Sequence, residues 1–440
     1  MSQEEVTQVQ VRFVTQQRKY AVIDSAILVP ARLKRYGLSE IVNHLLGSEN
    51  PVPFDFLIEG QFLRTSLSEY LENAGLSTEN LITIEYVESM LPPTPMSSFQ
   101  HDDWISSVKG FSQHSLFLTG SYDNYVRIWN TSGECVSTFR DHTAPVKDVA
   151  WLEVDETQAT CLSASQDQSV LAWQYSFSSD DQTVLYECKG HKASVESVAV
   201  DPSKQHFATA SWDSTIKIWT SSIPTEDETD YVEDARHKRR KTHKTDDRKS
   251  KSAASTLEGH VGPVSSVVFD SQDANALYSG GWDHSVRIWD VEQRVNVSTK
   301  VMTNHDVNTN RIQNCEKVVY GIAHSPHSKL LASGHADKTV RLWDPRADDV
   351  TVVKLTLISH TLWVPTVSWS PTSAYMLVSG SYDGTCKLWD IRSKAPVYTI
   401  AAPLVAKGEA TKKVFTVDWE GERILSGGED CQLRIHSAKM

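Results

Sequence analysis

The chain has 440 residues, of which 40% are hydrophobic and 22% charged, and its formal net charge is -13 at pH 7. An acidic balance of this size argues against nucleic-acid binding by the whole surface, although it permits a local basic patch. No run approaches 18 apolar residues and the start, MSQEEVTQVQ, is polar and acidic, so we expect an intracellular, soluble protein without a leader or membrane span. The six cysteines form no close C-x-x-C pair, so we expect small core residues in a reducing compartment.

Residues 9–88 carry no internal repeat and predict a small mixed domain, which we place at 1–91. Ser39 is a plausible N-cap for its helix, and Ser66 opens a second helical turn. The predicted elements are, in order, strands at 9–14 and 19–23, a helix at 39–46, strands at 54–58 and 61–63, a helical turn at 66, and a strand at 81–87. This order resembles a ubiquitin-like β-grasp domain. Three prolines at 92, 93 and 95 then predict a stiff linker over 92–98.

From residue 99 onward a motif recurs at intervals of roughly 40 to 45 residues, the period of a propeller blade. An aspartate is followed six residues later by tryptophan, or by histidine in the last unit, and is preceded four residues earlier by a hydroxyl side chain. The aspartate pairs are Asp123 and Trp129, Asp167 and Trp173, Asp213 and Trp219, Asp283 and Trp289, Asp337 and Trp343, Asp383 and Trp389, and Asp430 and His436. The hydroxyl residues are Thr119, Ser163, Thr209, Ser279, Ser333, Ser379 and Ser426.

A histidine precedes the aspartate by 22 to 25 residues in five units, at His101, His142, His191, His260 and His360. Together these positions resemble the WD repeat, and the resemblance implies a hydrogen-bonded network of histidine, hydroxyl, aspartate and tryptophan in each blade. Such a network has a physical reason, because a tight turn buries polar groups that must find hydrogen-bond partners. The fifth unit offers only His305, 32 residues upstream, and the seventh has no clear histidine, so we expect looser networks there.

The chain ends within four residues of His436, which leaves no room for the outer strand of a seventh blade. We expect the segment near 97–100, with Phe99, to supply that strand and remove two open sheet edges. The predicted fold is therefore mainly β, a seven-bladed WD-repeat propeller over 99–440 preceded by the ubiquitin-like α+β domain.

An insertion at about 221–256 interrupts the repeats between the third and fourth units. It begins acidic, turns basic and lacks core residues, so we predict a disordered loop. Its basic run, Lys238, Arg239, Arg240 and Lys241, fits a nuclear-import patch or an RNA-phosphate contact, and it is equally compatible with a solvated loop.

Aromatic residues precede the turn aspartate in four of the seven units, at Tyr122, Trp212, Trp282 and Tyr382. Trp104 and Trp363 each follow a repeat histidine by three residues and are expected on the same rim of the ring. Clustered rim aromatics favour a protein-binding hot spot. The alternative is that these rings pack across neighbouring turns as structural filler.

Two segments of the N-terminal domain, KRYGLSEIVNHLLG at 34–47 and PVPFDFLIEG at 51–60, extend the resemblance beyond the repeats. With the repeats they resemble the WD-repeat subunit of the PeBoW complex, a eukaryotic assembly factor for the large ribosomal subunit. The resemblance implies a non-enzymatic protein of the nucleolus and nucleoplasm that acts in rRNA processing. Its propeller would bind the propeller of the block-of-proliferation subunit, which holds pescadillo, and its ubiquitin-like domain would dock on the ATPase midasin for ATP-driven release from the pre-ribosome.

The same resemblance assigns the docking residue to the loop before the last strand of the ubiquitin-like domain, where it falls on Glu79. It would complete the magnesium site of midasin in trans, and no intrinsic cofactor is expected. Magnesium prefers hard oxygen ligands, so a carboxylate suits this role. Without the resemblance, Glu79 would be an ordinary exposed carboxylate.

Three other functional classes are possible, and one of them, a pure scaffold with a vestigial ubiquitin-like domain, differs from the first interpretation only in the role of Glu79. An enzyme is disfavoured because the same histidine, serine and aspartate constellation occurs five times and no Walker loop or H-E-x-x-H motif is present. A substrate receptor of a cullin-RING ubiquitin ligase is the alternative, because two successive units end in W-D-x-R, at 343–346 and 389–392.

Overall fold

The computed structural model describes residues 7–48, 50–75, 77, 80–226, 228, 248–301, 318–347, 353–401 and 411–439. These residues form two compact units, and the first boundary between them falls between Pro93 and Thr94. In the described part of the chain, no helix is long and apolar enough to cross a membrane.

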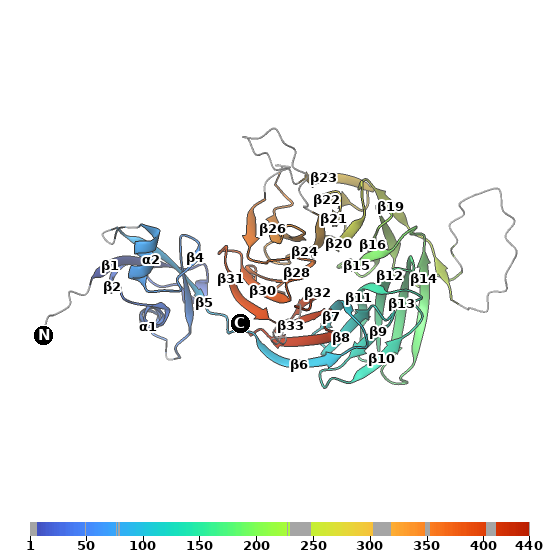
Figure 1. Ribbon diagram of the computed structural model, residues 1–440, viewed down its shortest axis with the longest axis horizontal. Helices are drawn as coiled ribbons and strands as arrows, with labels where there is room; N and C mark the ends of the chain where they lie inside the picture. The colour runs from blue at the N-terminus through green and yellow to red at the C-terminus, as the bar shows by residue number, and fades with distance from the viewer. Residues whose placement is uncertain are drawn as a thin grey trace. The chain divides into compact units, whose positions relative to one another are not determined.

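The N-terminal unit is a mixed five-stranded sheet with two helices (Figure 1). The strand order is β2-β1-β5-β3-β4, with β1 and β5 parallel. The elements are β1 (Gln8–Val14), a 3-10 turn (Arg18–Tyr20), β2 (Ala26–Pro30), α1 (Arg35–Leu46), β3 (Phe54–Ile58), β4 (Gln61–Phe62), α2 (Leu67–Ala74) and β5 (Ile82–Glu88). This order of elements and the sheet topology are those of the predicted β-grasp. The core lies between the sheet and helices, where Phe13, Phe54, Phe56 and Tyr86 are all buried.

Two predictions in this unit are wrong. The strand that pairs with β1 is β2 at Ala26–Pro30, not the predicted segment at 19–23. That segment is instead hydrogen-bonded to the Tyr86 hydroxyl, which donates to the Tyr20 carbonyl and accepts from the Val22 amide. Ser39 is not an N-cap, because α1 begins four residues earlier. Its buried hydroxyl instead accepts from the Phe54 amide and donates to the Val52 carbonyl, which joins the helix to β3.

The second unit contains seven sheets arranged around a centre, antiparallel except for one added strand in blade two (Figure 1). Their innermost strands neighbour one another in cyclic order, from β7 through β11, β15, β20, β24, β28 and β32 back to β7. This is the predicted seven-bladed propeller. Buried aliphatic and aromatic side chains fill the seams between successive blades from one to five and between blades seven and one.

The blades have these strands in chain order. Blade one has β7 (Ile105–Phe111), β8 (Leu116–Ser121), β9 (Val126–Trp129) and β10 (Cys135–Phe139). Blade two has β11 (Val146–Val154), β12 (Gln158–Ser165), β13 (Ser169–Ser176), β14 (Gln182–Lys189) and β18 (Ser250–Lys251). Blade three has β15 (Val195–Val200), β16 (His206–Ser211), β17 (Thr215–Thr220) and β19 (Ser255–Glu258). Blade four has β20 (Val264–Phe269), β21 (Ala276–Gly281), β22 (Ser285–Asp290) and β23 (Val295–Val301).

The last three blades follow the same plan. Blade five has β24 (Val319–His324), β25 (Leu331–His335), β26 (Thr339–Trp343) and β27 (Leu355–Ile358). Blade six has β28 (Thr366–Trp369), β29 (Met376–Gly380), β30 (Thr385–Asp390) and β31 (Pro396–Ala401). Blade seven has β32 (Val414–Glu420), β33 (Arg423–Gly428), β34 (Gln432–Ser437) and β6 (Thr94–Gln100).

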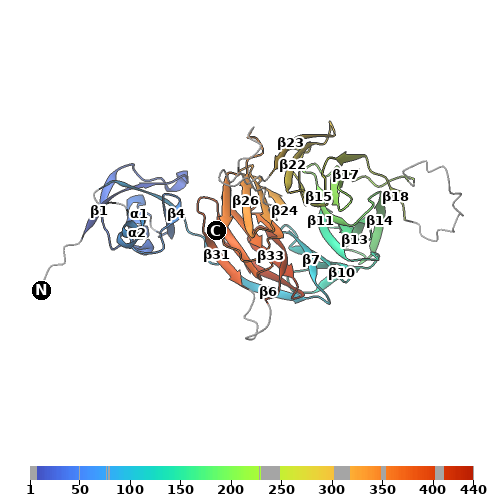
Figure 2. The same cartoon turned by 45° about the horizontal axis from the view of Figure 1, so that its top comes forward.

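The expected closing strand is confirmed, because β6 pairs antiparallel with β34 and completes blade seven (Figure 2). It starts at Thr94, however, so most of the predicted linker over 92–98 is strand. Pro95 is accommodated because the ladder shifts register beside it and this edge strand can spare its amide.

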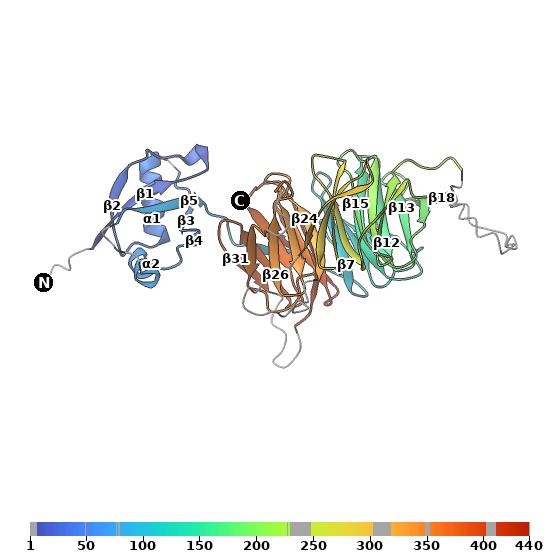
Figure 3. The ribbon, with the colours of Figure 1, turned by 90° about the horizontal axis from the view of Figure 1, so that it is seen from above.

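Part of the insertion predicted as a disordered loop over 221–256 is ordered. Residues 250–251 form β18, which adds a fifth, parallel strand to blade two at its outer edge (Figure 3), and β19 begins at Ser255. The anchor is Lys251, whose side chain is buried, lies 4.7 Å from the Tyr186 ring and donates to the Ser222 carbonyl. Residues 229–247, with the basic run, lie outside the described part of the chain.

Candidate functional site

The repeat residues hold one turn in every blade and so position the surface of the ring. In blade two, His142 lies 2.8 Å from the Asp167 carboxylate through Nδ1 and 2.7 Å from the Ser163 hydroxyl through Nε2, and the Trp173 indole donates to the same hydroxyl at 2.7 Å. Blades three and four have the same geometry. Their contacts are His191 to Asp213 at 2.9 Å and to Thr209 at 2.7 Å, Trp219 to Thr209 at 2.9 Å, His260 to Asp283 at 2.8 Å and to Ser279 at 2.7 Å, and Trp289 to Ser279 at 2.7 Å.

In blade six, His360 lies 2.9 Å from Asp383 and 2.8 Å from Ser379, and Trp389 is fully buried. In these blades burial alone would raise the pKa of the turn aspartate, but hydrogen bonds from the histidine and the following turn residue lower that pKa well below its ordinary value. The carboxylate therefore stays ionised and fixes the turn.

Arginine takes the place of histidine as the partner of the turn aspartate in the other three blades. It stands four residues after the aspartate, at Arg127, Arg341 and Arg434. Arg127 lies 2.7 Å from Asp123, and Arg434 lies 2.5 Å from Asp430. An arginine four residues after the turn aspartate is therefore a sequence signal for the partner of that aspartate, and a search for repeat histidines alone misses it.

In blade one the histidine and hydroxyl remain together. His101 lies 2.9 Å from Thr119, to which Trp129 donates at 3.0 Å. Burial and the nearby Arg127 lower the pKa of His101 to about 4, so this imidazole is neutral at physiological pH.

In blade five, His335 takes the hydroxyl contact, 2.7 Å from Ser333, while Trp343 donates to Ser333 at 2.6 Å. The sequence suggested His305, which lies outside the described residues. In blade seven, His436 and Ser426 are buried at the expected positions. The turn aspartate is therefore held by histidine or by arginine, and in blade four Asp283 contacts both His260 and Arg287.

The six aromatic residues predicted on the rim lie together in a nearly continuous arc, which we call the aromatic rim. It consists of Trp104, Tyr122, Trp212, Trp282, Tyr320, Trp363, Tyr382 and Phe415. Successive ring centroids lie 5.5 to 6.3 Å apart from Trp212 through Trp282, Tyr320, Trp363 and Tyr382 to Phe415, which meets Trp104 at 5.7 Å and Tyr122 at 6.2 Å.

The rings therefore pack on one another, as the filler alternative holds, yet the four tryptophans stay 38 to 47% exposed. Contact between rings does not use up their surface. An exposed aromatic patch of this extent is the usual composition of a protein-binding hot spot.

Two rim residues, Tyr320 and Phe415, were missed from the sequence. Each is the second residue of an inner strand, where the ladder to the next strand skips one residue. Such a β-bulge turns the side chain out of the normal alternation and toward the rim. A bulge does not alter the hydrophobic pattern enough to be read from one sequence.

The same bulge position carries charge where the aromatic rim is interrupted, at blades two and three. Lys147 lies 3.1 Å from the Tyr122 hydroxyl and 3.4 Å from Glu196, which occupies the corresponding position of blade three. The eight aromatic residues of the rim are thus accompanied by one ion pair, at blades two and three.

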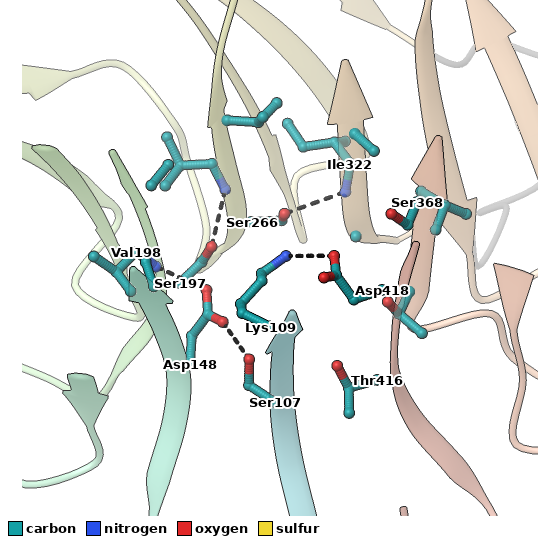
Figure 4. A pocket seen from close by; sticks show the side chains of 18 of the residues that line it. Ser107, Lys109, Asp148, Ser197, Val198, Ser266, Ile322, Ser368, Thr416 and Asp418 are labelled. Atoms are coloured by element: carbon teal, nitrogen blue, oxygen red, sulfur yellow. Dashed lines mark hydrogen bonds and ion pairs between the residues drawn. The ribbon is translucent and has the colours of Figure 1, made fainter. Parts of the chain in front are cut away.

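A central cavity of about 890 Å³ is lined in part by six of the rim residues, Tyr122, Trp212, Trp282, Tyr320, Tyr382 and Phe415. Figure 4 shows part of its wall. Its wall is polar. Lys109 points toward Asp418, with Nζ 3.4 Å from Oδ1, and Asp148 accepts from the Ser107 hydroxyl at 2.7 Å and from the Val198 amide at 2.9 Å. These contacts link neighbouring blades across the wall, so they serve the ring. Within the described residues, no group of three or more histidine, cysteine, aspartate or glutamate side chains is placed to hold a metal ion.

Three predicted sites have different outcomes. Glu79 and the basic run 238–241 lie outside the described residues, although α2 before Glu79 and β5 after it are described. The two W-D-x-R motifs are described. In each, the arginine bonds the aspartate of its own motif, Arg346 to Asp344 at 2.9 Å and Arg392 to Asp390 at 2.9 Å.

Comparison with known proteins identifies both units. Residues 9–71 match the NLE (NUC135) domain, and 93–130, 133–174, 182–220, 251–290, 307–344 and 352–390 match the WD domain, G-beta repeat. The chain is 38% identical over 438 residues to a ribosome biogenesis protein WDR12 homolog of Nematostella vectensis, covering 98% of this chain and 100% of the relative. It is 36% identical over 437 residues to the WDR12 homolog of Drosophila yakuba, covering 98% and 96%. It is also 36% identical over 462 residues to the ribosome biogenesis protein YTM1 of Coccidioides immitis, covering 99% and 96%. The chain therefore belongs to the WDR12 and YTM1 family of ribosome biogenesis proteins.

Proposed function

We propose that this protein is a non-catalytic assembly factor that holds partner proteins on the precursor of the large ribosomal subunit during rRNA processing. The observation that carries the proposal is the aromatic rim, whose four tryptophans are 38 to 47% exposed. In this proposal the partner is the propeller of the block-of-proliferation subunit, which brings pescadillo with it. The protein works in the nucleolus and nucleoplasm, and the run Lys238, Arg239, Arg240 and Lys241 serves its nuclear import.

Large aromatic side chains contribute most of the energy at protein interfaces because each covers much area at a low entropy cost. The rim also lies on turns that the repeat networks hold rigidly, so few side chains need to be ordered on binding. Lys147 and Glu196 add a charged element that restricts the choice of partner.

The rim is tested with full-length Trp282→Ala and Tyr382→Ala in a binding titration with the partner propeller. The matched control is Val297→Ala, which removes a 64% exposed apolar side chain from the outer strand β23. We expect each rim variant to weaken binding at least tenfold while the control binds as the unmodified protein does. Rim variants that fold and bind normally would rule the rim out as the interface.

The second part of the proposal concerns release. The N-terminal domain docks through Glu79 on the magnesium of midasin's adhesion site, and the ATPase then removes the complex from the pre-ribosome. Support comes from the chemistry of the loop between α2 and β5. Gly75 ends α2 with a φ of 65°, and Asn80 follows at the entry to β5, so the carboxylate between them is carried by a short connection. One carboxylate brought by a partner can complete an octahedral magnesium site.

Docking is tested by binding of the full-length protein to midasin's adhesion-site domain with magnesium and with EDTA. Glu79→Ala and Glu79→Asp should abolish binding as EDTA does, whereas Glu72→Ala, which removes an exposed carboxylate of α2, should not. Binding that persists in both Glu79 variants refutes the assignment.

Co-purification separates this proposal from the ligase-receptor alternative. Ribosomal assembly factors among the bound proteins support it, while a cullin and its adaptor support the alternative. Arg346 and Arg392 would have to leave their own aspartates to contact such an adaptor.

A further inference from the structure

The N-terminal unit is connected to the second unit through the strand that closes the ring. Ser89 is still bonded within the N-terminal unit, through its amide to the Pro53 carbonyl at 2.8 Å and its hydroxyl to Asp55 at 2.7 Å. Only residues 90–93, two of them proline, lie between it and Thr94, the first residue of β6. This connection has little slack, so tension on the N-terminal unit passes directly to β6.

The strand β6 is held unevenly along its length. Thr94, Pro95 and Met96 are exposed, the ladder is irregular at Pro95, and proline offers no amide to it. The apolar anchor is at the other end, where Phe99 is 7% exposed. Its ring centroid lies 5.7 Å from that of Trp129 in blade one. A pull on Thr94 therefore meets the weakest part of the strand first.

Beyond its anchored end, β6 continues directly into the networks of blade one. The His101 amide donates to the Cys431 carbonyl at 2.8 Å, and the His101 imidazole lies 2.9 Å from Thr119. Asp102 lies 2.9 Å from Arg127, the clamp of the blade-one turn. These contacts connect the C-terminal end of β6 directly to the turn of blade one.

The aromatic rim follows two residues later in the chain. The Trp104 carbonyl accepts from the Tyr122 amide at 2.9 Å and from the Ser121 hydroxyl at 3.0 Å, and its ring packs on Tyr122 and Phe415. One continuous segment, 94–104, thus joins the N-terminal unit to the rim of blades seven and one.

We propose that β6 is a force-sensitive coupling element: tension on the N-terminal unit unzips β6 from β34, starting at Thr94, and loosens Trp104 and Tyr122 on the rim. This inference rests on the proposed function only for the source of the tension and for the partner that the rim would release. The response of the strand depends on the fold alone. Such an element would let a pull at one end of the chain weaken a partner bound at the rim before the remaining blades unfold.

The geometry of the termini gives a direct test, because Thr94 and Ser437 are paired at the same end of the ladder. Pulling the two chain ends apart with optical tweezers unzips β6 from β34 one pair at a time. The strand has seven residues and so spans about 23 Å, which predicts a first extension step of about 46 Å when both strands separate. Unfolding of the whole N-terminal unit would release more than about 200 Å and is therefore distinguishable.

A disulfide lock supplies the matched comparison. Thr94→Cys with Ser437→Cys joins the pair where unzipping begins, and paired strand residues lie at a separation that a disulfide can span. The control, Lys217→Cys with Thr256→Cys, locks a pair in the outer ladder of blade three. Both are made with Cys135→Ser, which removes an exposed thiol. We expect the step to vanish in the oxidised lock, to return on reduction and to persist in the control. A step that survives the oxidised lock, or no step of this size in the unlocked protein, overturns the proposal.

Coupling to the rim is measured by hydrogen exchange in the full-length protein. Phe99→Ala weakens the anchor of β6, and Phe139→Ala removes the 1% exposed aromatic at the corresponding place in β10. We expect faster exchange at 101–104 and 121–122 in Phe99→Ala and not in Phe139→Ala. Unchanged exchange there in a folded Phe99→Ala protein refutes the coupling. None of these measurements involves midasin, so failure of Glu79 docking and failure of the strand mechanism give different results.

Discussion

Lys109 gives a sharp prediction about how the ring is held closed. It lies on β7 of blade one, with its ammonium group 3.4 Å from Asp418 on β32 of blade seven (Figure 4). The negative charge of Asp418 raises the pKa of Lys109, and burial opposes this effect. Asp148, on β11 of blade two, also raises it. Lys109→Met keeps the volume of the side chain but leaves two carboxylates facing the cavity without their cation.

The expected loss of stability in Lys109→Met follows from the distance between the Lys109 and Asp418 charges and from the exposure of the Lys109 side chain. Two unit charges 3.4 Å apart interact by about 5 kcal/mol at an effective dielectric of about 20 and by about 1 kcal/mol in water. The Lys109 side chain is 42% exposed to the cavity, so solvent screening reduces the loss to about 2 kcal/mol of unfolding free energy.

The loss should depend on pH. Burial already raises the pKa of Asp148, and Lys109 opposes that shift. In Lys109→Met the folded state therefore holds the Asp148 proton to higher pH than the unfolded state does. Because the folded state then binds more protons, its stability falls as pH rises from about 4 through the raised pKa, and the deficit is larger at neutral than at acidic pH.

Urea unfolding followed by tryptophan fluorescence measures the propeller alone, because all 13 tryptophans lie between residues 104 and 419. Lys192→Met, an exposed lysine, is the control. A double-mutant cycle with Asp418→Asn isolates the pair, and we expect the double variant to recover about 1 kcal/mol. If the two single effects add to within about 0.5 kcal/mol, the pair does not hold the seam and the electrostatic argument is wrong.

Two further predictions concern the backbone and a buried histidine. Gly321→Ala would place a Cβ 2.4 Å from the Pro365 carbonyl oxygen of the next blade, whereas a Cβ at Gly262 would meet nothing nearer than 3.5 Å. Gly321→Ala should therefore lower the unfolding free energy by at least about 2 kcal/mol, and Gly262→Ala by much less. Urea titration measures both losses, and losses of similar size would contradict the close approach of Gly321 to the next blade. Burial, followed by Arg127, lowers the pKa of His101 to about 4, so its contribution to stability is present above about pH 6.5 and is lost as pH falls toward 4. His101→Gln should flatten that part of the stability profile, and an imidazole that titrates near 6.5 by NMR would disprove the shift.

The sequence predicted the architecture well because each blade uses similar residues to satisfy the same buried polar groups of a turn. Turn aspartates such as Asp167 and Asp283 need partners in every unit, and the fixed spacing of their hydroxyl and tryptophan partners appears in the chain as a period. The closing strand was predictable for the same reason, since Phe99 occupies the position of Phe139 in the next unit.

Two of the failures arise from contact between different elements of the chain, and a third from a contact within one strand. Lys251 looks like one more charge in a polar insertion, yet Tyr186 buries its side chain and turns the insertion's end into a strand. Ser39 has the side chain of an N-cap but bonds the backbone of β3 from inside α1. His335 takes the hydroxyl contact expected of His305, because it lies two residues from Ser333 and needs no loop to reach it. None of these contacts leaves a local pattern.

The bulge residues explain where recognition resides in a fold built from repeats. Positions in the turn network must be nearly the same in every blade, because each satisfies the same buried groups. The bulged second residue of an inner strand is outside the ladder and faces a neighbouring blade or the rim, so the fold places few demands on it. It varies accordingly: it is serine in blades one and four, and charged or aromatic in four others. The residues are Ser106, Lys147, Glu196, Ser265, Tyr320 and Phe415. The repeated residues therefore make the ring, and the unrepeated ones at its bulges and turns give each sector of the rim its own chemistry.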